Sequence, residues 1–264
     1  MAEDSVHTTR VAKKLEWFGL TVVKRYLTKD KDSRDLRDVH SNPEFYDKDI
    51  DLVLNLPNAQ KMTIDLKVDS YYGSDPTRKI RGLCNPDSGF ILLETIGQLQ
   101  YDRSRRVSAN GTLPVRQKAD VPGWFFTSSA DQIYYYFLAL LNTETQLNPY
   151  YAEYVKLVSD SQPTDEVENR LLRELRVDRD LLVSFSLSDA RTWYDTAPET
   201  MFHGYAPAPN PSYLTLNKRV KRDLFISNGI GKSHGSIFPL GQTGFPVTGG
   251  AIHHGRLPRF LTVL

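Results

Sequence analysis

The sequence predicts an α/β protein in which helices flank a mixed central sheet. Two helical patterns, one near the N-terminus and one over residues 165–177, lie on either side of a pair of alternating strands within residues 50–69. Apolar residues at every second position indicate a half-buried strand, and recurrence every three to four residues indicates a helix. The chain has 264 residues, 40% hydrophobic and 25% charged, which is a globular composition that can supply a core.

The N-terminal region predicts a helix followed by a strand. Apolar residues recur at helical spacing between Val11 and Phe18, and Gly19 occupies the position of a C-cap. Residues 20–27 are rich in β-branched and aromatic side chains, which favour a strand. Residues 28–49 are charged and irregular, and we expect a solvated loop there.

Residues 50–69 predict a β-hairpin whose register can be inferred. Two alternating segments flank a short turn-like sequence, as in two antiparallel neighbours. Pairing Leu52 with Ile64 brings the apolar side chains of both strands together. The same register places Asp51 opposite Asp65, with Cβ atoms about 4.5–5.5 Å apart and Lys67 on the same face.

Two interpretations of this acidic pair are open. Opposed like charges destabilise a hairpin, but two adjacent carboxylates suit a hard divalent cation such as Mg²⁺. A lysine beside the metal can orient or help deprotonate a water, while the metal stabilises charge that builds on a phosphate. Alternatively, Asp51 and Asp65 lie on the solvated face of an exposed hairpin, where Lys67 screens both charges.

Further elements follow along the chain. The apolar run over residues 90–96 predicts a buried strand, and residues 124–126 predict another. Residues 133–141 predict either a strand or a helix, because a continuous apolar run has no diagnostic period. Residues 165–177 predict a helix with acidic residues in its first turn and basic residues later, as the helix dipole favours. Ser188 is a candidate cap for one more short helix.

Composition excludes several classes of protein. The 33 basic and 32 acidic residues give a net charge of +1, so any electrostatic argument about partners must be local. No run approaches the roughly eighteen apolar residues of a membrane helix, and the acidic N-terminus is unlike a secretory signal. The single cysteine excludes intramolecular disulfides and multi-cysteine metal sites. We therefore expect no membrane partner and a reducing, cytoplasmic location.

The spacing of the site residues resembles a known family. Asp51 followed by Asp65-Leu66-Lys67 resembles the active-site signature of the PD-(D/E)XK nuclease superfamily, which has the restriction-endonuclease-like fold. The first aspartate of that family lies within or at the end of one strand, and its acid-x-Lys triplet lies on the next. Glu16 lies on a helix that matches the family's N-terminal helix. Residues 90–94 and 123–131 follow in an order similar to that of phage-type and mobile-element nucleases.

The resemblance implies a Mg²⁺- or Mn²⁺-dependent deoxyribonuclease. Asp51 and Asp65 would hold the metal, Lys67 would position or activate the attacking water, and Glu16 would assist. One mark of the family is missing, since Ile50 stands where a proline often precedes the first aspartate. The Gln-x-x-x-Tyr helix of the exonuclease branch is also absent in register, which favours an endonuclease. Cutting both strands would require a homodimer, because one active site cuts one strand.

The same residues leave two other functions open. A nucleic-acid-binding or structural protein could keep the fold without cleavage, and an RNA or small-nucleotide phosphodiesterase would use the same chemistry. The resemblance favours work in phage, mobile elements or genome defence, hence in the cytoplasm of a bacterium or a phage-infected host cell.

The predicted organisation is a nuclease core over residues 1–145 and an irregular C-terminal extension over residues 146–264, which packs on the core and completes a substrate groove. From residue 203 onward, seven Lys or Arg oppose one acid. Phosphate contacts dominate affinity for DNA, so clustered basic residues are candidates for contacting its backbone. These candidates are Lys218, Arg219, Lys221, Arg222, Arg103, Arg105 and Arg106.

Overall fold

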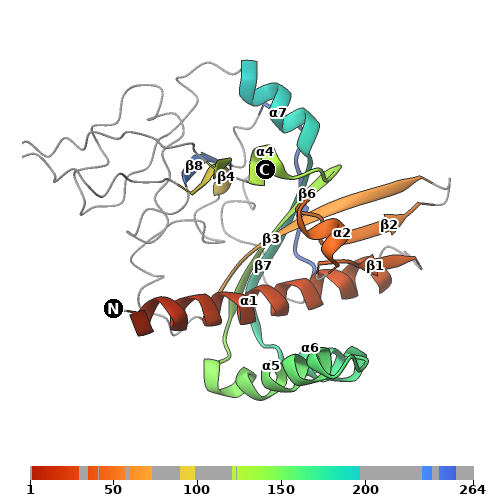
Figure 1. The fold of residues 1–264 in the computed structure, drawn as a ribbon, viewed down its shortest axis with the longest axis vertical. Helices are drawn as coiled ribbons and strands as arrows, with labels where there is room; N and C mark the ends of the chain where they lie inside the picture. Colours follow the sequence, from red (N-terminus) through yellow and green to blue (C-terminus); the bar gives the residue numbers. More distant parts are fainter. Residues whose placement is uncertain are drawn as a thin grey trace, which may run out of the picture.

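The computed structural model describes a sheet with helices packed against it (Figure 1). It describes residues 2–29, 35–40, 42–56, 60–72, 90–98, 121–122, 124–196, 234–239 and 244–253, and only the backbone at 2–12, 46, 71, 90–92, 94–98, 121–122 and 234–239. In chain order the elements are α1 (Ala2–Lys29), β1 (Leu36–Asp38), α2 (Pro43–Tyr46), β2 (Leu52–Asn55), β3 (Lys61–Tyr72), β4 (Phe90–Gln98), β5 (Val121–Pro122), α4 (Trp124–Thr127), β6 (Gln132–Leu140), α5 (Glu144–Ser159), α6 (Asp165–Glu174), β7 (Val177–Ser186), α7 (Leu187–Thr196), β8 (His234–Pro239) and β9 (Thr248–Gly250).

The main sheet has six strands in the order β1-β2-β3-β6-β7-β9. Strands β3 and β6 are parallel, and every other neighbouring pair is antiparallel. A smaller sheet has the order β5-β4-β8. The predicted α/β class with a mixed sheet and flanking helices is therefore confirmed. Strands β7 and β9 come from the part of the chain expected to form an extension, and the boundary at residue 145 stays a prediction.

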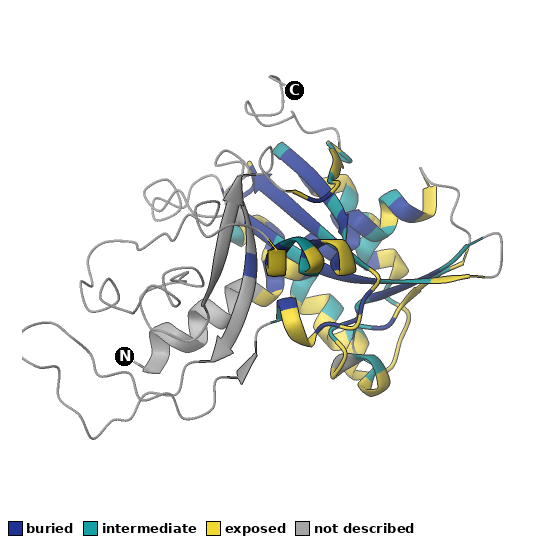
Figure 2. Cartoon of the chain, turned by 90° about the horizontal axis from the view of Figure 1, so that it is seen from above, coloured by how far each residue is buried: buried dark blue, intermediate teal, exposed yellow. Residues whose placement is uncertain are grey.

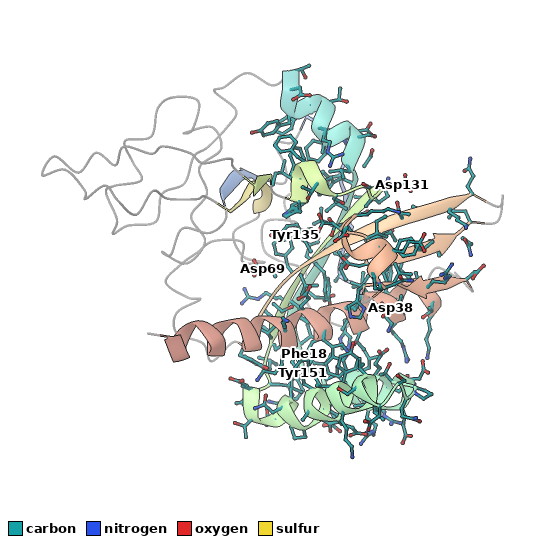
Figure 3. The ribbon with its side chains drawn as sticks, viewed as in Figure 1. Phe18, Asp38, Asp69, Asp131, Tyr135 and Tyr151 are labelled. Atoms are coloured by element: carbon teal, nitrogen blue, oxygen red, sulfur yellow. The ribbon has the colours of Figure 1, made fainter. Side chains whose placement is uncertain are left out.

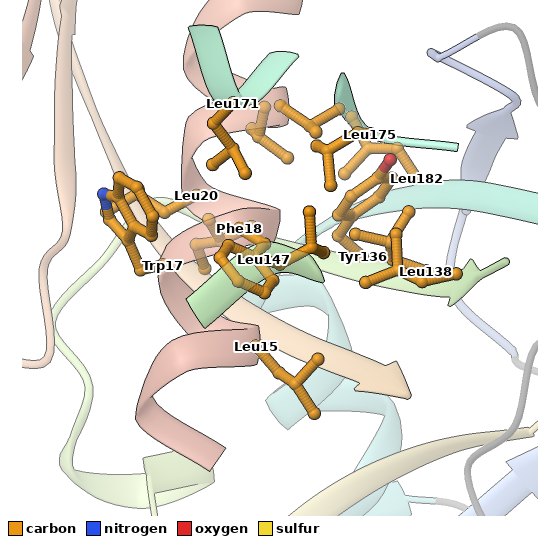
Figure 4. Close-up of a cluster of buried hydrophobic side chains, with 14 of the residues drawn as sticks. Leu15, Trp17, Phe18, Leu20, Tyr136, Leu138, Leu147, Leu171, Leu175 and Leu182 are labelled. Atoms are coloured by element: carbon orange, nitrogen blue, oxygen red, sulfur yellow. The ribbon is translucent and has the colours of Figure 1, made fainter. Parts of the chain in front are cut away.

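Strand β6 lies between two hydrophobic cores. Its side chains alternate: Tyr136 and Leu138 enter the core beneath α1, α5 and α6, whereas Tyr135 and Phe137 enter the core near α4 and α7. Figure 2 shows the buried central strands between more exposed helices, and Figure 4 shows the first of the two cores. Because both faces are covered, β6 is a continuous apolar run, which explains why its period alone could not distinguish strand from helix.

Helix α1 is longer than predicted. The prediction of a strand over residues 20–27 is wrong, because these residues continue the helix. Val23 and Leu27 are buried and continue the helical stripe into the first core. Gly19 does not end the helix. A Cβ added there would lie only 2.4 Å from Cγ1 of Val68 on β3. The glycine therefore allows the close approach of helix and sheet, and the helix continues to Lys29.

Three other predicted elements differ from the structure. Residues 28–49, expected as a loop, contain β1 and α2, and residues 124–126, expected as a strand, form the start of α4. The carbonyl groups of Phe125 in α4 and of Ser128 just after it accept hydrogen bonds from the Arg191 guanidinium, a tertiary contact that local sequence cannot reveal. The helix expected over residues 165–177 ends earlier, at Glu174, because β7 begins at Val177.

Helices α5 and α6 are joined to α1 by buried contacts. Phe18 of α1 and Tyr151 of α5 lie between these helices (Figure 3), and Trp17 stacks on Tyr154 with ring centroids 4.3 Å apart. The buried Lys14 ammonium donates a hydrogen bond to Asn148 at 2.7 Å. Among the described helices, none has the length and apolar character needed to cross a bilayer.

Candidate functional site

The hairpin forms in the predicted register. Leu52 pairs with Ile64 across β2 and β3. Asp51 stands just before β2, where its N–H donates to the Ile64 carbonyl at 2.9 Å. Two residues further along β3, the Leu66 N–H donates a hydrogen bond to the Asp51 side chain, with Oδ2 as the acceptor at 2.7 Å. The Asp51 carboxylate is thus fixed at the start of β2, beside the acid-x-Lys segment of β3.

Asp65 is a buried carboxylate with no hydrogen bond. The residue is 0% exposed, and neither Oδ1 nor Oδ2 has a hydrogen-bond partner in the described part of the chain. Burial raises the pKa of Asp65 to about 7, and the neighbouring Asp51 and Asp49 charges raise it too, while Lys67 opposes the increase. Burying a carboxylate is costly even when a lysine lies beside it, and the raised pKa of Asp65 indicates that the Lys67 charge does not fully offset this cost.

Lys67 pairs with Asp65 and remains partly accessible. Its Nζ lies 2.8 Å from Asp65 Oδ1 in an ion pair that lacks hydrogen-bond geometry, and its side chain is 24% exposed. Burial lowers the pKa of Lys67, but the charges of Asp65, Asp51 and Asp49 outweigh that effect and raise it. The ammonium is therefore charged and lies between a buried acid and solvent.

The polar face of the hairpin is not a solvated surface. Asp65 and Lys67 point to the side of the sheet that carries Tyr135 and Phe137 on β6, and α4 covers that side near Lys67. The Lys67 Nζ lies 5.0 Å from the centre of the Trp124 ring. The alternative interpretation, a screened pair of acids on an exposed hairpin, is therefore wrong for Asp65.

Other charged groups surround the two carboxylates. Glu16 is exposed on α1. Burial raises the pKa of the Asp51 carboxyl, and the charge of Glu16 adds to that increase. The hydrogen bond from Leu66 and the charge of Lys67 oppose it. Asp49 also acts on this site, because its charge raises the pKa values of Asp65 and Lys67. Glu16 was predicted. Asp49, two residues before Asp51, was missed, although its position in an acidic stretch was a signal.

A carboxylate–imidazole pair adjoins the site. His40 Nδ1 lies 2.7 Å from Asp38 Oδ1, and Asp38 Oδ2 lies 2.9 Å from the Lys24 ammonium. Figure 3 shows Asp38 beside α1, at the end of the sheet that carries β1. The Asp38 hydrogen bond raises the pKa of His40, and the charge of Asp51 contributes to the same increase. Nothing in the sequence pattern predicts that His40 lies within electrostatic range of Asp51.

Asp131 and Ser128, which follow α4, have structural contacts. Asp131 Oδ2 accepts hydrogen bonds from the N–H and the hydroxyl of Thr63, both at 2.8 Å. Ser128 Oγ accepts from the Ala130 N–H at 3.3 Å. The Asp131 contacts connect the start of β6 to β3 (Asp131 is labelled in Figure 3) and so help to hold the acid-x-Lys strand in place, whereas the Ser128 contact is local.

Asp51 and Asp65 provide the number of carboxylate ligands that Mg²⁺ commonly has in proteins. Mg²⁺ is usually held by one or two carboxylates together with water and phosphate oxygens. Among the described residues there is no group of three or more His, Cys, Asp or Glu side chains arranged to hold a metal. Two carboxylates do not by themselves make a closed structural metal site, which has about four protein ligands.

The predicted phosphate-contacting residues lie outside the described residues. They are Arg103, Arg105, Arg106, Lys218, Arg219, Lys221 and Arg222.

Compared with protein-family models, curated proteins and solved structures, the chain has no match. Its function therefore has to be inferred from the geometry of the site.

Proposed function

We propose that this protein is a Mg²⁺- or Mn²⁺-dependent nuclease that hydrolyses phosphodiester bonds of DNA. The observation that carries the proposal is Asp65, a fully buried carboxylate without a hydrogen bond, next to Asp51 and paired with Lys67. A divalent cation would compensate the charge of Asp65 and lower the pH at which it ionises.

Asp51 suits the role of second ligand. Its Oδ2 is fixed by the Leu66 N–H, which leaves Oδ1 without a hydrogen bond to any described residue. A carboxylate whose orientation is set by one oxygen can present the other to a cation at little further cost in entropy. When bound, the metal would supply a more acidic water and stabilise the charge that develops on the phosphate.

Lys67 would position the water or a phosphate oxygen. A lysine ammonium has three N–H donors and no acceptor, so a charged Lys67 can hold an oxygen in place. Its remaining exposure lets substrate reach it. In the reaction, the water oxygen bonds to phosphorus and loses a proton to solvent, one P–O ester bond breaks, and the leaving oxygen takes up a proton.

The resemblance to PD-(D/E)XK nucleases supports this choice over other hydrolases. In this chain the acid-x-Lys triplet lies on β3, as in the family. The first aspartate stands one residue before β2, whereas in the family it lies within or at the end of a strand. The proposal extends to an endonuclease that acts on DNA, works in the cytoplasm of a bacterial or phage-infected cell, and forms a homodimer if it cuts both strands. Glu16 would assist from α1.

Nicking of supercoiled plasmid tests the proposal. Purified protein should nick the plasmid with Mg²⁺ or Mn²⁺ and lose this activity in EDTA. Lys67→Ala and Asp65→Asn should each lower the rate by at least about 100-fold, because catalytic groups of this kind contribute about 10²–10⁴-fold. Lys61→Ala and Asp47→Asn are matched controls, since both residues are exposed and lie near the site in sequence.

Each alternative function has its own result in this experiment. DNA binding without nicking under any divalent ion would replace the enzyme with a binding protein that retains the site. Cleavage of RNA or of a small nucleotide diester, with plasmid left intact, would keep the chemistry and change the substrate. Nicking that persists in Lys67→Ala at the wild-type rate would refute the assignment of the site.

A further inference from the structure

The short helix α4 places an aromatic ring against the Lys67 ammonium. The Lys67 Nζ lies 5.0 Å from the Trp124 ring centroid, within the about 6 Å at which a cation is attracted to a ring face. Trp124 meets Phe125 edge-on, with centroids 6.1 Å apart and an interplanar angle of 84°. Phe125 is fully buried. The indole is therefore held between the core and the charged amine.

Several polar contacts fix α4 in this position. The Arg191 guanidinium of α7 donates to the Phe125 carbonyl at 2.7 Å and to the Ser128 carbonyl at 2.8 Å. The Thr127 hydroxyl donates to Asp49 Oδ2 at 2.7 Å. Asp49 has a φ of +50°, in the left-handed region that few residues other than glycine, asparagine and aspartate adopt readily. The helix is thus tied to α7 and to the turn that leads into Asp51.

The contact with Trp124 adds to the ion pair that Lys67 makes with Asp65. The lysine side chain has four rotatable bonds, and ordering it costs up to about 2 kcal/mol of entropy. Its ion pair with Asp65 holds the ammonium from one side, with Nζ 2.8 Å from Oδ1. A ring face attracts an ammonium without competing for its N–H donors, which stay available for a water or a phosphate oxygen.

We infer that Trp124 is a positioning residue for Lys67, which holds the ammonium over the indole face so that its N–H groups point at the reacting oxygen. This role rests on the proposed nuclease function. It assigns to α4 a task in the reaction that is distinct from the contribution of Phe125 to the core.

Fluorinated tryptophans at position 124 test the inference with little change in shape. Increasing numbers of ring fluorines weaken the attraction between the ring face and a cation while the indole outline stays nearly constant. We expect the kcat for nicking to fall progressively with fluorine content, by about 2- to 30-fold in total, because that is the range of one cation–π contact. The KM for plasmid should change little, since the indole does not itself contact DNA.

Two controls separate a positioning role from a structural one. Fluorinated phenylalanine at position 126 should leave kcat unchanged. Phe126 lies in the same helix, is 46% exposed and packs its ring against Phe125, whereas the ring near Lys67 is that of Trp124. Trp124→Phe, which keeps a ring face, should retain more activity than Trp124→Leu. Thermal unfolding of each variant, measured in parallel, shows whether it is folded.

The outcomes distinguish this inference from the function on which it rests. If the wild-type protein nicks plasmid and kcat does not depend on the fluorine content at position 124, the positioning role is refuted and the nuclease stands. If kcat falls equally with fluorination at positions 124 and 126, the effect is structural and the role is again refuted. If the wild-type protein nicks no substrate with any divalent ion, the nuclease itself is refuted.

Discussion

Replacement of Asp65 by asparagine should stabilise the protein in the absence of metal. Asparagine keeps the shape of the side chain and removes its charge. In the folded protein, burial raises the pKa of Asp65 from an ordinary 3.8 to about 7, against the opposing attraction of Lys67. The folded state therefore resists ionisation of this carboxyl, and asparagine, which never ionises, escapes that cost.

The size and sign of the effect follow from the two pKa values. Each pKa unit corresponds to about 1.4 kcal/mol, so a difference of about three units corresponds to about 4 kcal/mol. The folded state binds the proton more tightly than the unfolded state, so Asp65 lowers stability as the pH rises from 3.8 toward 7. The stabilisation by asparagine should be complete above about pH 7 and absent below about pH 4.

Urea unfolding in EDTA measures this difference. Wild type, Asp65→Asn and the exposed control Asp47→Asn are compared at about pH 8 and about pH 4, with the slope m checked for constancy. We expect the free energy of unfolding of Asp65→Asn to exceed that of the wild type by a few kcal/mol at the higher pH only. Asp47→Asn should match the wild type at both, because residue 47 is exposed.

Two results would contradict this account. If Asp65→Asn were less stable than the wild type at the higher pH, the attraction between Asp65 and Lys67 would exceed the cost of burying the carboxylate. If the variant gained the same stability at both pH values, the gain would come from packing or hydrogen bonding of the amide, and ionisation would play no part.

Three further predictions concern the metal, α1 and the network beside the site. At about 100 times its Kd, Mn²⁺ should stabilise the wild type by about 2.7 kcal/mol and should not stabilise Asp51→Asn in the same thermal melt. Gly19→Ala should cost about 1–3 kcal/mol in urea unfolding, because its Cβ would overlap Val68, whereas Gly250→Ala, with no atom within 4 Å of its Cβ, should cost far less. Burial raises the pKa of Asp38, but contacts with a histidine and a lysine outweigh that effect and lower the pKa from 3.8 to about 2. Asp38→Asn should therefore destabilise the protein by about 2 kcal/mol at neutral pH in urea unfolding. The difference in stability should be lost as the pH falls through about 2.

The hairpin could be predicted because its determinants are local. Alternation fixes the strands, and matching the apolar faces fixes the register, which the structure reproduces at Leu52 and Ile64. The approach of Asp51 to Asp65 and Lys67 follows from that register, so the centre of the candidate site was accessible from sequence alone. A register shifted by one residue would have turned the acids to the opposite face.

The elements that were predicted wrongly depend on contacts between distant segments. Gly19 looks like a helix terminus until Val68 of β3 is placed against it. The segment that starts at Trp124 looks like a strand because its residues are aromatic, yet its carbonyls are satisfied by Arg191. Trp124 and His40 likewise reach the site through the tertiary fold, and neither spacing nor composition brings them to it.

The burial of Asp65 is itself an argument for function. Its neighbour in the parallel register of β6 is Ile133, which is fully buried, and Tyr135 and Phe137 continue the same apolar face. An apolar residue or an asparagine at position 65 would remove the cost of an ionised carboxylate, which is about 4 kcal/mol. That is a large fraction of the stability of an ordinary domain. Lys67 and the buried Asp69 also lie on this face of β3, opposite apolar residues of β6. Such a departure from the pattern of a core is typical of functional sites. Under the proposed function, a bound cation would account for the carboxylate at position 65, because it would compensate the charge that the fold buries there.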